Sequence, residues 1–213
     1  MTVRILASFV FFYALAAPAQ PISPEFLPAS VGVMLRFERK PSDHFLKQME
    51  SEVDGIFQPT GLTVAWEVLD GKHRPGAYSR VVIVEMRGRC STPEPAEAEP
   101  GALRLGWTIV NDGEVSPFAV VDCDQVGRAI NSAHSAVFRR NLIFAQYVRL
   151  AGRVLAHELM HALLKTTDHH ETDIARSPLR AADLQIGARL TSQEVAALRD
   201  IGRNSPPAIA GRR

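Results

Sequence analysis

The sequence has 213 residues, of which 46% are hydrophobic and 22% charged, as is typical of a soluble globular protein with one buried core. Its 24 basic and 23 acidic side chains leave a net charge of +1. This balance excludes the strongly basic surface of a nucleic-acid-binding protein and the acidic tail of many interaction proteins.

Residues 1–19 have the organisation of a secretory signal peptide. Arg4 provides a short positive region, residues 5–17 are apolar, and residues 17–19 read Ala-Pro-Ala, which matches an A-x-A cleavage site. The apolar stretch is shorter than the roughly 20 residues that a membrane span requires. We therefore expect a mature chain that starts near Gln20, is secreted or periplasmic, and leaves the membrane once the signal is cleaved. An uncleaved anchor is the alternative.

The first part of the mature chain alternates strands with one helix. Residues 31–38 are apolar with partial alternation, which predicts a first strand. Ser42 or Asp43 can cap a helix that runs to about Phe57 with apolar side chains on one face. Further strands are expected over residues 62–69, 79–86, 103–110 and 118–122. The strand over 79–86 is rich in β-branched residues and suits a buried central position.

From residue 125 onward the pattern is helical. Helices are expected over residues 125–135, 141–165, 179–187 and 191–202, a loop over the Pro- and Glu-rich stretch 92–101, and a loose tail over 204–213. The order of strand, helix, strands and then helices predicts an α+β fold with one mixed, twisted sheet of four to five strands, covering helices and a helical C-terminal subdomain. We expect a single domain over residues 20–203.

The predicted helix over 141–165 carries three residues that point to chemistry, namely His157, Glu158 and His161. Residues four apart lie on one face of a helix, about 6 Å apart along its axis, so both imidazoles can bind one zinc ion. Glu158 follows the first ligand directly, and its carboxylate can take the proton of a metal-bound water. Two surface histidines on an amphipathic helix are the alternative, but apolar residues surround this pair, and buried polar groups are costly unless they are paired or bind a metal.

These residues match the HExxH motif of the zincin metallopeptidases. The strand–helix–strands order before the helix resembles the N-terminal half of the metzincin clan. The resemblance implies a zinc-dependent endopeptidase with its active-site cleft beside an edge strand. The run from His157 to His169 is also similar to uncharacterised secreted bacterial proteins of this class.

The sequence departs from the metzincin pattern after the motif. That pattern continues HExxHxxGxxH, with a glycine at position 164 and the third ligand at position 167, where this chain has Leu164 and Thr167. No methionine follows Met160, so the methionine turn under the metal is missing. No tyrosine follows Tyr147 that could stabilise an oxyanion from the C-terminal half.

His169 is therefore expected to be the third metal ligand. A helix that ends near Lys165 and folds back through the next three residues would bring His169 to the metal. The alternatives are His170, Asp168, Asp173 and, by the gluzincin pattern of a glutamate from a later helix, Glu194. The run Thr191-Ser-Gln-Glu194 also reads as a capping box, in which the glutamate returns to the start of its own helix.

Cys90 and Cys123 are the only cysteines of the chain. In an oxidising compartment they are expected to form a disulfide, with two buried free thiols as the alternative. The segment around Cys90 also resembles the cysteine switch of matrix metalloproteinase propeptides, which implies a thiolate on the zinc.

Three further features bear on a peptidase site. Residues 105–110 are the best candidate for an edge strand that pairs with an extended substrate, although Trp107 could instead pack in the core. Arg176 or Arg180 could stabilise an oxyanion in place of a tyrosine, and Asp183 could orient a ligand imidazole. A solvated surface position is the simpler interpretation of these three charged residues.

The sequence as a whole predicts a secreted peptidase with one Zn²⁺ ion, in which Glu158 is the general base and peptides or proteins are the substrates. One alternative is a non-catalytic exported protein in which zinc stabilises the fold. The other is a secreted binding module in which the HExxH pattern is accidental.

Overall fold

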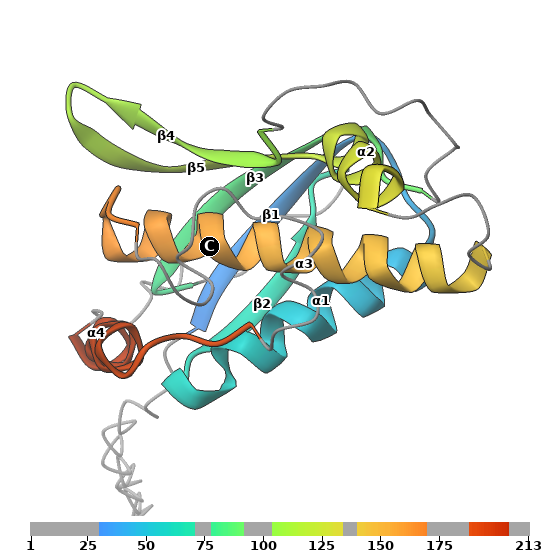
Figure 1. The fold of residues 1–213 in the computed structure, drawn as a ribbon. Coiled ribbons are helices and arrows are strands. Elements are labelled where there is room, and N and C mark those ends of the chain that lie inside the picture. Colours follow the sequence, from blue (N-terminus) through green and yellow to red (C-terminus); the bar gives the residue numbers. More distant parts are fainter. Residues whose placement is uncertain (1–29, 71–77, 92–103, 134–139, 170–187, 205–213) are drawn as a thin grey trace, which may run out of the picture.

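The computed structural model describes residues 30–70, 78–91, 104–133, 140–169 and 188–204 (Figure 1). The expected signal peptide, the stretch 92–101 and the helix expected over 179–187 lie outside these residues. Asn204 closes the last helix, and the rest of the expected tail lies outside as well.

The described elements confirm the α+β fold and every strand and helix expected within these ranges. In chain order they are β1 (Ser30–Arg39), α1 (Asp43–Phe57), the 3-10 helix η1 (Gln58–Thr60), β2 (Thr63–Val68), β3 (Arg80–Arg89), β4 (Gly106–Asn111), β5 (Glu114–Asp122), α2 (Cys123–Ala133), α3 (Arg140–Leu164) and α4 (Ser192–Asn204). The largest boundary difference is at β5, which begins at Glu114 rather than Phe118.

The five strands form one mixed sheet in the order β2-β1-β3-β5-β4. Strands β2, β1, β3 and β5 are parallel, and β4 pairs antiparallel with β5 at the edge of the sheet. The hairpin between β4 and β5 turns at Asp112 and Gly113, whose φ angles of 50° and 80° are both left-handed. Such turns match the twist of the two strands that they join, and Asp-Gly is a favoured pair for them. The edge strand expected from the sequence is thus confirmed.

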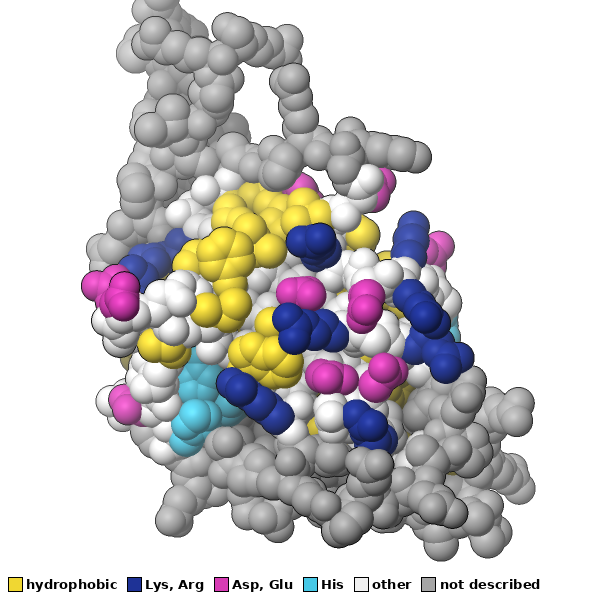
Figure 2. Space-filling model, turned by 90° about the horizontal axis from the view of Figure 1, so that it is seen from above, with side chains coloured by type: hydrophobic (Ala, Val, Ile, Leu, Met, Phe, Trp, Pro, Cys, Tyr) yellow, Lys and Arg dark blue, Asp and Glu magenta, His cyan; other side chains and the backbone are white. Residues whose placement is uncertain are grey.

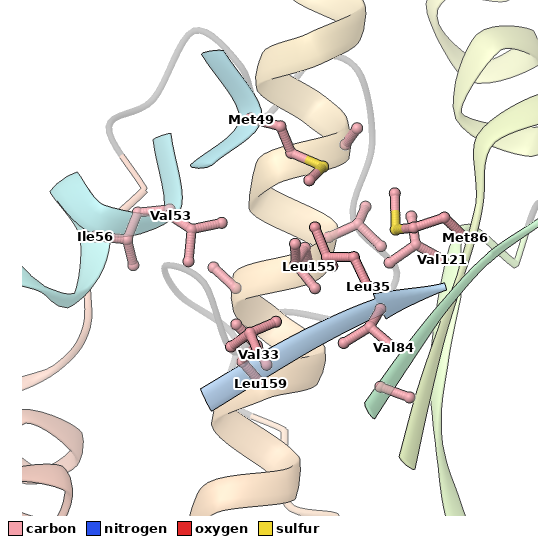
Figure 3. Packing of buried hydrophobic residues seen from close by; sticks show 14 of the residues in the cluster. Val33, Leu35, Met49, Val53, Ile56, Val84, Met86, Val121, Leu155 and Leu159 are labelled. Atoms are coloured by element: carbon pink, nitrogen blue, oxygen red, sulfur yellow. The ribbon is translucent and has the colours of Figure 1, made fainter. Parts of the chain in front are cut away.

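Helices α1 and α3 cover one face of the sheet, and α3 crosses it as the long orange helix of Figure 1. In the core, Leu155 and Leu159 of α3 lie against Val33 and Leu35 of β1 (Figure 3). Every residue of α3 from Leu150 to Leu163 is buried. A helix that is buried on all sides cannot slide or rotate freely, so the side chains that it carries are held in place.

Strand β3 lies at the centre of the sheet, as expected, but buries only one of its faces. Val82, Val84 and Met86 are buried, whereas Val81 is 39% exposed on the opposite face. Phe118 of the neighbouring strand β5 is also exposed, at 43%. Figure 2 looks onto the molecule from above and shows hydrophobic side chains gathered beside a row of basic and acidic ones.

Two contacts fix α3 against α1. Arg153 of α3 donates through Nε to Glu52 of α1 at 3.0 Å. Gly152 precedes it, and a Cβ at this position would lie 2.9 Å from the Cβ of Glu52, so the close approach of the two helices requires glycine here. Helix α1 is itself capped by Ser42, whose side chain accepts a hydrogen bond from the backbone N–H of Phe45.

A disulfide joins Cys90, directly after β3, to Cys123 at the start of α2. The expected pairing is confirmed, and the interpretations of free thiols and of a cysteine switch are wrong because both sulfur atoms are in the bond. The two residues are 33 positions apart, and closing a loop of that length stabilises the folded chain by roughly 3–4 kcal/mol through the entropy of the unfolded state. Within the described residues, none of the helices combines the length and hydrophobicity of a membrane span.

Candidate metal centre

The HExxH residues lie in the buried middle of α3. His157, Glu158 and His161 are 6%, 4% and 4% exposed. The apolar side chains around them on the same helix belong to the core. Three polar side chains in such surroundings require partners, because an unpaired polar group in an apolar environment costs free energy.

The two imidazoles of the motif face each other. Nε2 of His157 lies 3.0 Å from Nε2 of His161, and the rings meet edge to face. The Nδ1–H of His161 donates to the backbone carbonyl of Thr166 at 2.7 Å. This hydrogen bond places the proton on Nδ1 and leaves the lone pair of Nε2 directed at the space shared with His157, as in a histidine that binds a metal.

The chain reverses sharply where α3 ends. Lys165 adopts a left-handed φ of 53°, and the N–H of Thr166 donates to the carbonyl of His161 at 3.3 Å. The N–H of Asp168 then donates to Oγ1 of Thr166 at 3.1 Å. A left-handed residue followed by a hydrogen bond that spans five residues is a common helix ending. The turn returns the chain toward the histidines of α3 without the glycine of the metzincin pattern.

This turn brings His169 to the two buried histidines. Its ring lies 5.2 Å from that of His157 and 4.7 Å from that of His161, between centroids. One nitrogen from each of the three rings lies within 4.8 Å of the others. In a tetrahedral zinc site with Zn–N bonds of roughly 2.1 Å, such nitrogen atoms are about 3.4 Å apart. The three imidazoles are therefore a group that could hold one metal ion.

The other candidates for the third ligand do not join this group among the described residues. His170 and Asp173 lie outside those residues. Asp168 is exposed in the turn, and its carboxylate is not part of the cluster. Glu194 is buried at the start of α4, where its Oε2 accepts the N–H of Thr191 at 2.6 Å while Thr191 Oγ1 accepts the N–H of Glu194. The capping box expected from the sequence is thus formed.

Glu158 points to the side of α3 that faces the edge strand. Its Oε2 accepts a hydrogen bond of 2.7 Å from the hydroxyl of Thr108 in β4. Burial raises the pKa of Glu158 to about 7, and the hydrogen bond from Thr108 and the charge of Arg104 oppose that rise. A carboxylate with a pKa in this range can both take and return a proton near neutral pH.

Burial also lowers the pKa of His161, and its hydrogen bond to Thr166 opposes this shift. A lowered pKa favours the neutral imidazole, which is the form that binds a metal.

A cleft of about 230 Å³ opens between β4 and the histidine cluster. One wall is β4 with the residues just before it, another is the HExxH side of α3, and the third is the turn after that helix. The lining residues are Arg104, Gly106, Trp107, Thr108, Val110, Val115, His157, Glu158, His161, Thr166, Thr167 and His169. A Cβ on Gly106 would lie 2.9 Å from the carbonyl oxygen of Val120 in β5 and 3.1 Å from Oε1 of Glu158 in α3. Only glycine therefore lets β4 lie this close to both β5 and α3.

Two cleft residues were not identified as functional from the sequence, namely Thr108 and Arg104. The sequence does identify their strand as an edge strand, and that is the signal that could have drawn attention to them. Trp107 is partly exposed rather than packed in the core, and its ring lies 4.7 Å from the guanidinium carbon of Arg104 and 5.1 Å from that of Arg87.

Tyr147, the last tyrosine of the chain, has a structural role and was not expected at the site. It is fully buried, and its hydroxyl lies 3.3 Å from the carbonyl oxygens of Arg89 and Cys123. The proposed oxyanion residues Arg176 and Arg180 and the proposed orienting residue Asp183 lie outside the described part of the chain.

No protein-family model and no curated protein matches the sequence. Among solved structures, the fold is similar to the crystal structure of archaemetzincin from Methanopyrus kandleri, with a TM-score of 0.48 and 9% sequence identity over 84% of this chain and 98% of that chain. A similarity of this size says nothing of function, so function is inferred below from the geometry of the site.

Proposed function

We propose that this chain is a secreted zinc-dependent peptidase with a single catalytic domain over residues 20–203. The observation that carries the proposal is the position of Glu158. Its carboxylate is buried beside a cluster of three histidines and opens, with them, into a cleft along an edge strand. These are the parts that metal-assisted hydrolysis of a peptide bond requires.

His157, His161 and His169 would hold the metal. Three imidazoles also suit copper, iron or nickel, but a site with three nitrogen ligands and one open position is typical of catalytic zinc. A zinc ion bound there would polarise a carbonyl group and lower the pKa of a water molecule toward about 7.

Glu158 would act as the general base. From its position beside the cluster it can accept a proton from that water, with the Thr108 hydroxyl donating to Oε2 and so holding the carboxylate in one orientation. Its raised pKa allows the same group to pass the proton to the leaving nitrogen. Strand β4 is an edge strand of the sheet that the described residues form, and an extended peptide could pair with it as a further strand.

The cleft supports a catalytic rather than a purely structural metal. A structural zinc site is closed by four protein ligands, whereas three histidines line this cleft, and the one carboxylate that lines it in the described part of the chain, that of Glu158, is hydrogen bonded to Thr108. A non-catalytic zinc protein has no need of a buried carboxylate at this position.

Secretion is proposed from two features. Residues 1–19 have the pattern of a cleaved signal, and the disulfide between Cys90 and Cys123 fits a chain that folds in an oxidising compartment.

Metal removal tests the proposed function. The exported protein, loaded with zinc, is expected to hydrolyse an unfolded protein such as casein and a set of quenched fluorescent peptides. Removing the metal with a chelator should reduce the rate to background, because neither the carbonyl nor the water is then activated. Adding one equivalent of zinc back should restore the rate. Unchanged activity in protein shown to be metal-free, or no hydrolysis by the zinc-loaded protein, would contradict the proposal.

A further inference from the structure

The cleft beside the histidine cluster has a basic rim. Arg104, two residues before the start of β4, is the one Arg or Lys side chain that lines the cleft in the described part of the chain. It is exposed, unlike the neighbouring Glu158. Figure 2 shows histidine side chains that reach the surface with a basic side chain beside them.

Trp107 holds this guanidinium at the rim. The guanidinium carbon of Arg104 lies 4.7 Å from the centre of the indole ring, within the range of a cation–π contact. A long side chain on a surface normally samples many rotamers, and stacking on an aromatic ring limits that freedom. The charge is therefore kept close to the cleft instead of being spread over the surface.

Within the part of the chain that the structure describes, the charge of Arg104 acts on Glu158 but is not held in a salt bridge. Among the described residues no acidic side chain lies within ion-pair distance of it. The contrast is Arg87, which contacts the same indole ring from 5.1 Å but donates to Glu85 at 3.2 Å and does not line the cleft. Glu158, the one carboxylate among the described residues that line the cleft, is buried and accepts a hydrogen bond from Thr108. Arg104 thus offers its donors to whatever enters the cleft.

We infer that Arg104 makes this cleft selective for peptides that carry a carboxylate close to the scissile bond. A guanidinium binds a carboxylate through two parallel hydrogen bonds, so the recognised group is a planar anion and not simply a polar side chain. The carboxylate could be an Asp or Glu side chain at a position that binds near the Gly106 end of β4, or the C-terminus of the substrate. This inference rests on the proposed peptidase function and adds a substrate class to it.

Matched peptides test the inference and distinguish the two sources of the carboxylate. A first pair differs only by Glu or Gln at one position near the cleavage site, with the C-terminus amidated. A second pair contains Gln and differs only in a free or amidated C-terminus. For the zinc-loaded protein, kcat/KM is expected to be about fivefold higher for the anionic member of one pair, as a partly exposed ion pair allows. Equal values within both pairs would overturn the inference while leaving the peptidase proposal intact.

Variants assign the preference to one residue. Arg104→Gln should bring the ratio of kcat/KM between the anionic and the neutral peptide of the sensitive pair close to one, mainly through a change in KM. Arg104→Glu should instead favour a third peptide with Lys at the same position. Arg87→Gln is the control, because it removes a cation from the same indole ring outside the cleft, and it should keep the wild-type ratio. A wild-type ratio in Arg104→Gln would overturn the inference. So would an equal fall of kcat for all peptides that leaves the wild-type ratio in place, because loss of the Arg104 charge near Glu158 is enough to explain such a fall.

Binding without turnover provides a second readout. Calorimetric titration of the same peptides into zinc-loaded Glu158→Gln protein should show tighter binding of the anionic member of the sensitive pair. This difference in affinity should disappear in the double variant that also carries Arg104→Gln. If the wild-type protein cleaves none of the peptides but this difference is found, the peptidase proposal fails and the carboxylate site remains. If the affinities within each pair are equal, the carboxylate site fails.

Discussion

Replacing Glu158 with Gln is expected to reduce kcat for peptide hydrolysis by about 10²- to 10⁴-fold, the contribution of a well-positioned general base. Gln has the same shape and can still accept the hydrogen bond that Thr108 donates to Oε2, so the fold and the histidine cluster should be retained. It cannot take a proton from water. The measurement is kcat on a fluorescent peptide, together with the zinc content of each preparation.

Two controls separate the loss of the base from a loss of metal and from a general effect of removing a carboxylate. The zinc content of the variant should equal that of the wild type, because none of the three histidines is altered. Glu114→Gln, at an exposed position on the β4–β5 hairpin outside the cleft, is a matched control and should keep the wild-type rate. A Glu158→Gln variant that retains more than about a tenth of the wild-type rate would show that this carboxylate is not the base.

His169→Ala is the second change with a large expected effect. It removes one of three ligands and should weaken zinc binding by about 10²-fold or more, since even partners that only orient a ligand change affinity by about 10- to 100-fold. Hydrolysis should fall with the loss of metal. Competition with a chromophoric chelator measures the affinity directly, and circular dichroism shows whether the fold is kept.

Neighbouring substitutions make the assignment of this ligand specific. Asp168→Ala alters an exposed residue in the same turn and should leave zinc affinity near the wild-type value. Glu194→Gln should do the same, because that carboxylate serves the capping box of α4. If Glu194→Gln loses the metal and His169→Ala retains it, the third ligand is the glutamate and the turn after α3 has another role.

The parts of the fold that could be predicted have local signals. His157 and His161 are four residues apart in an apolar helical pattern, and helix geometry alone places them on one face. The hairpin at Asp112 and Gly113 is equally local, because its two left-handed residues are of types that tolerate this conformation. The capping box of α4 also needs only the residues 191–194.

For the turn after α3, the sequence predicts the return of the chain but not the residue that reverses its direction. A return of the chain that brings His169 to the metal site was expected, and the cluster of three histidine rings has that arrangement. The residue that reverses the chain is Lys165, although a side chain at a left-handed φ of 53° costs roughly 1–2 kcal/mol. No sequence rule selects a lysine for this position, so the absence of the metzincin glycine gave no indication of the turn that replaces it.

The contacts that complete the site are non-local and left no signal in the sequence. Thr108 and Glu158 are 50 positions apart and meet only because β4 pairs with β5 in one register and α3 packs beneath them. The same pairing brings Arg104 to the cleft, while the sequence directed attention to arginines of the C-terminal part. Likewise, the apolar run of β3 suggested burial on both faces, but Val81 is exposed because α1 and α3 cover the other face.

X-ray absorption at the zinc edge of the purified protein tests the central claim most directly, because it reports the number and type of atoms bound to the metal. We expect about one zinc ion per chain, with a first shell of three imidazole nitrogens and one oxygen at roughly 2.0–2.1 Å. Loss of one imidazole in His169→Ala should be visible in the same spectrum. A protein that retains no zinc, or a closed shell of four protein ligands, would contradict the assignment of His157, His161 and His169 as an open catalytic site.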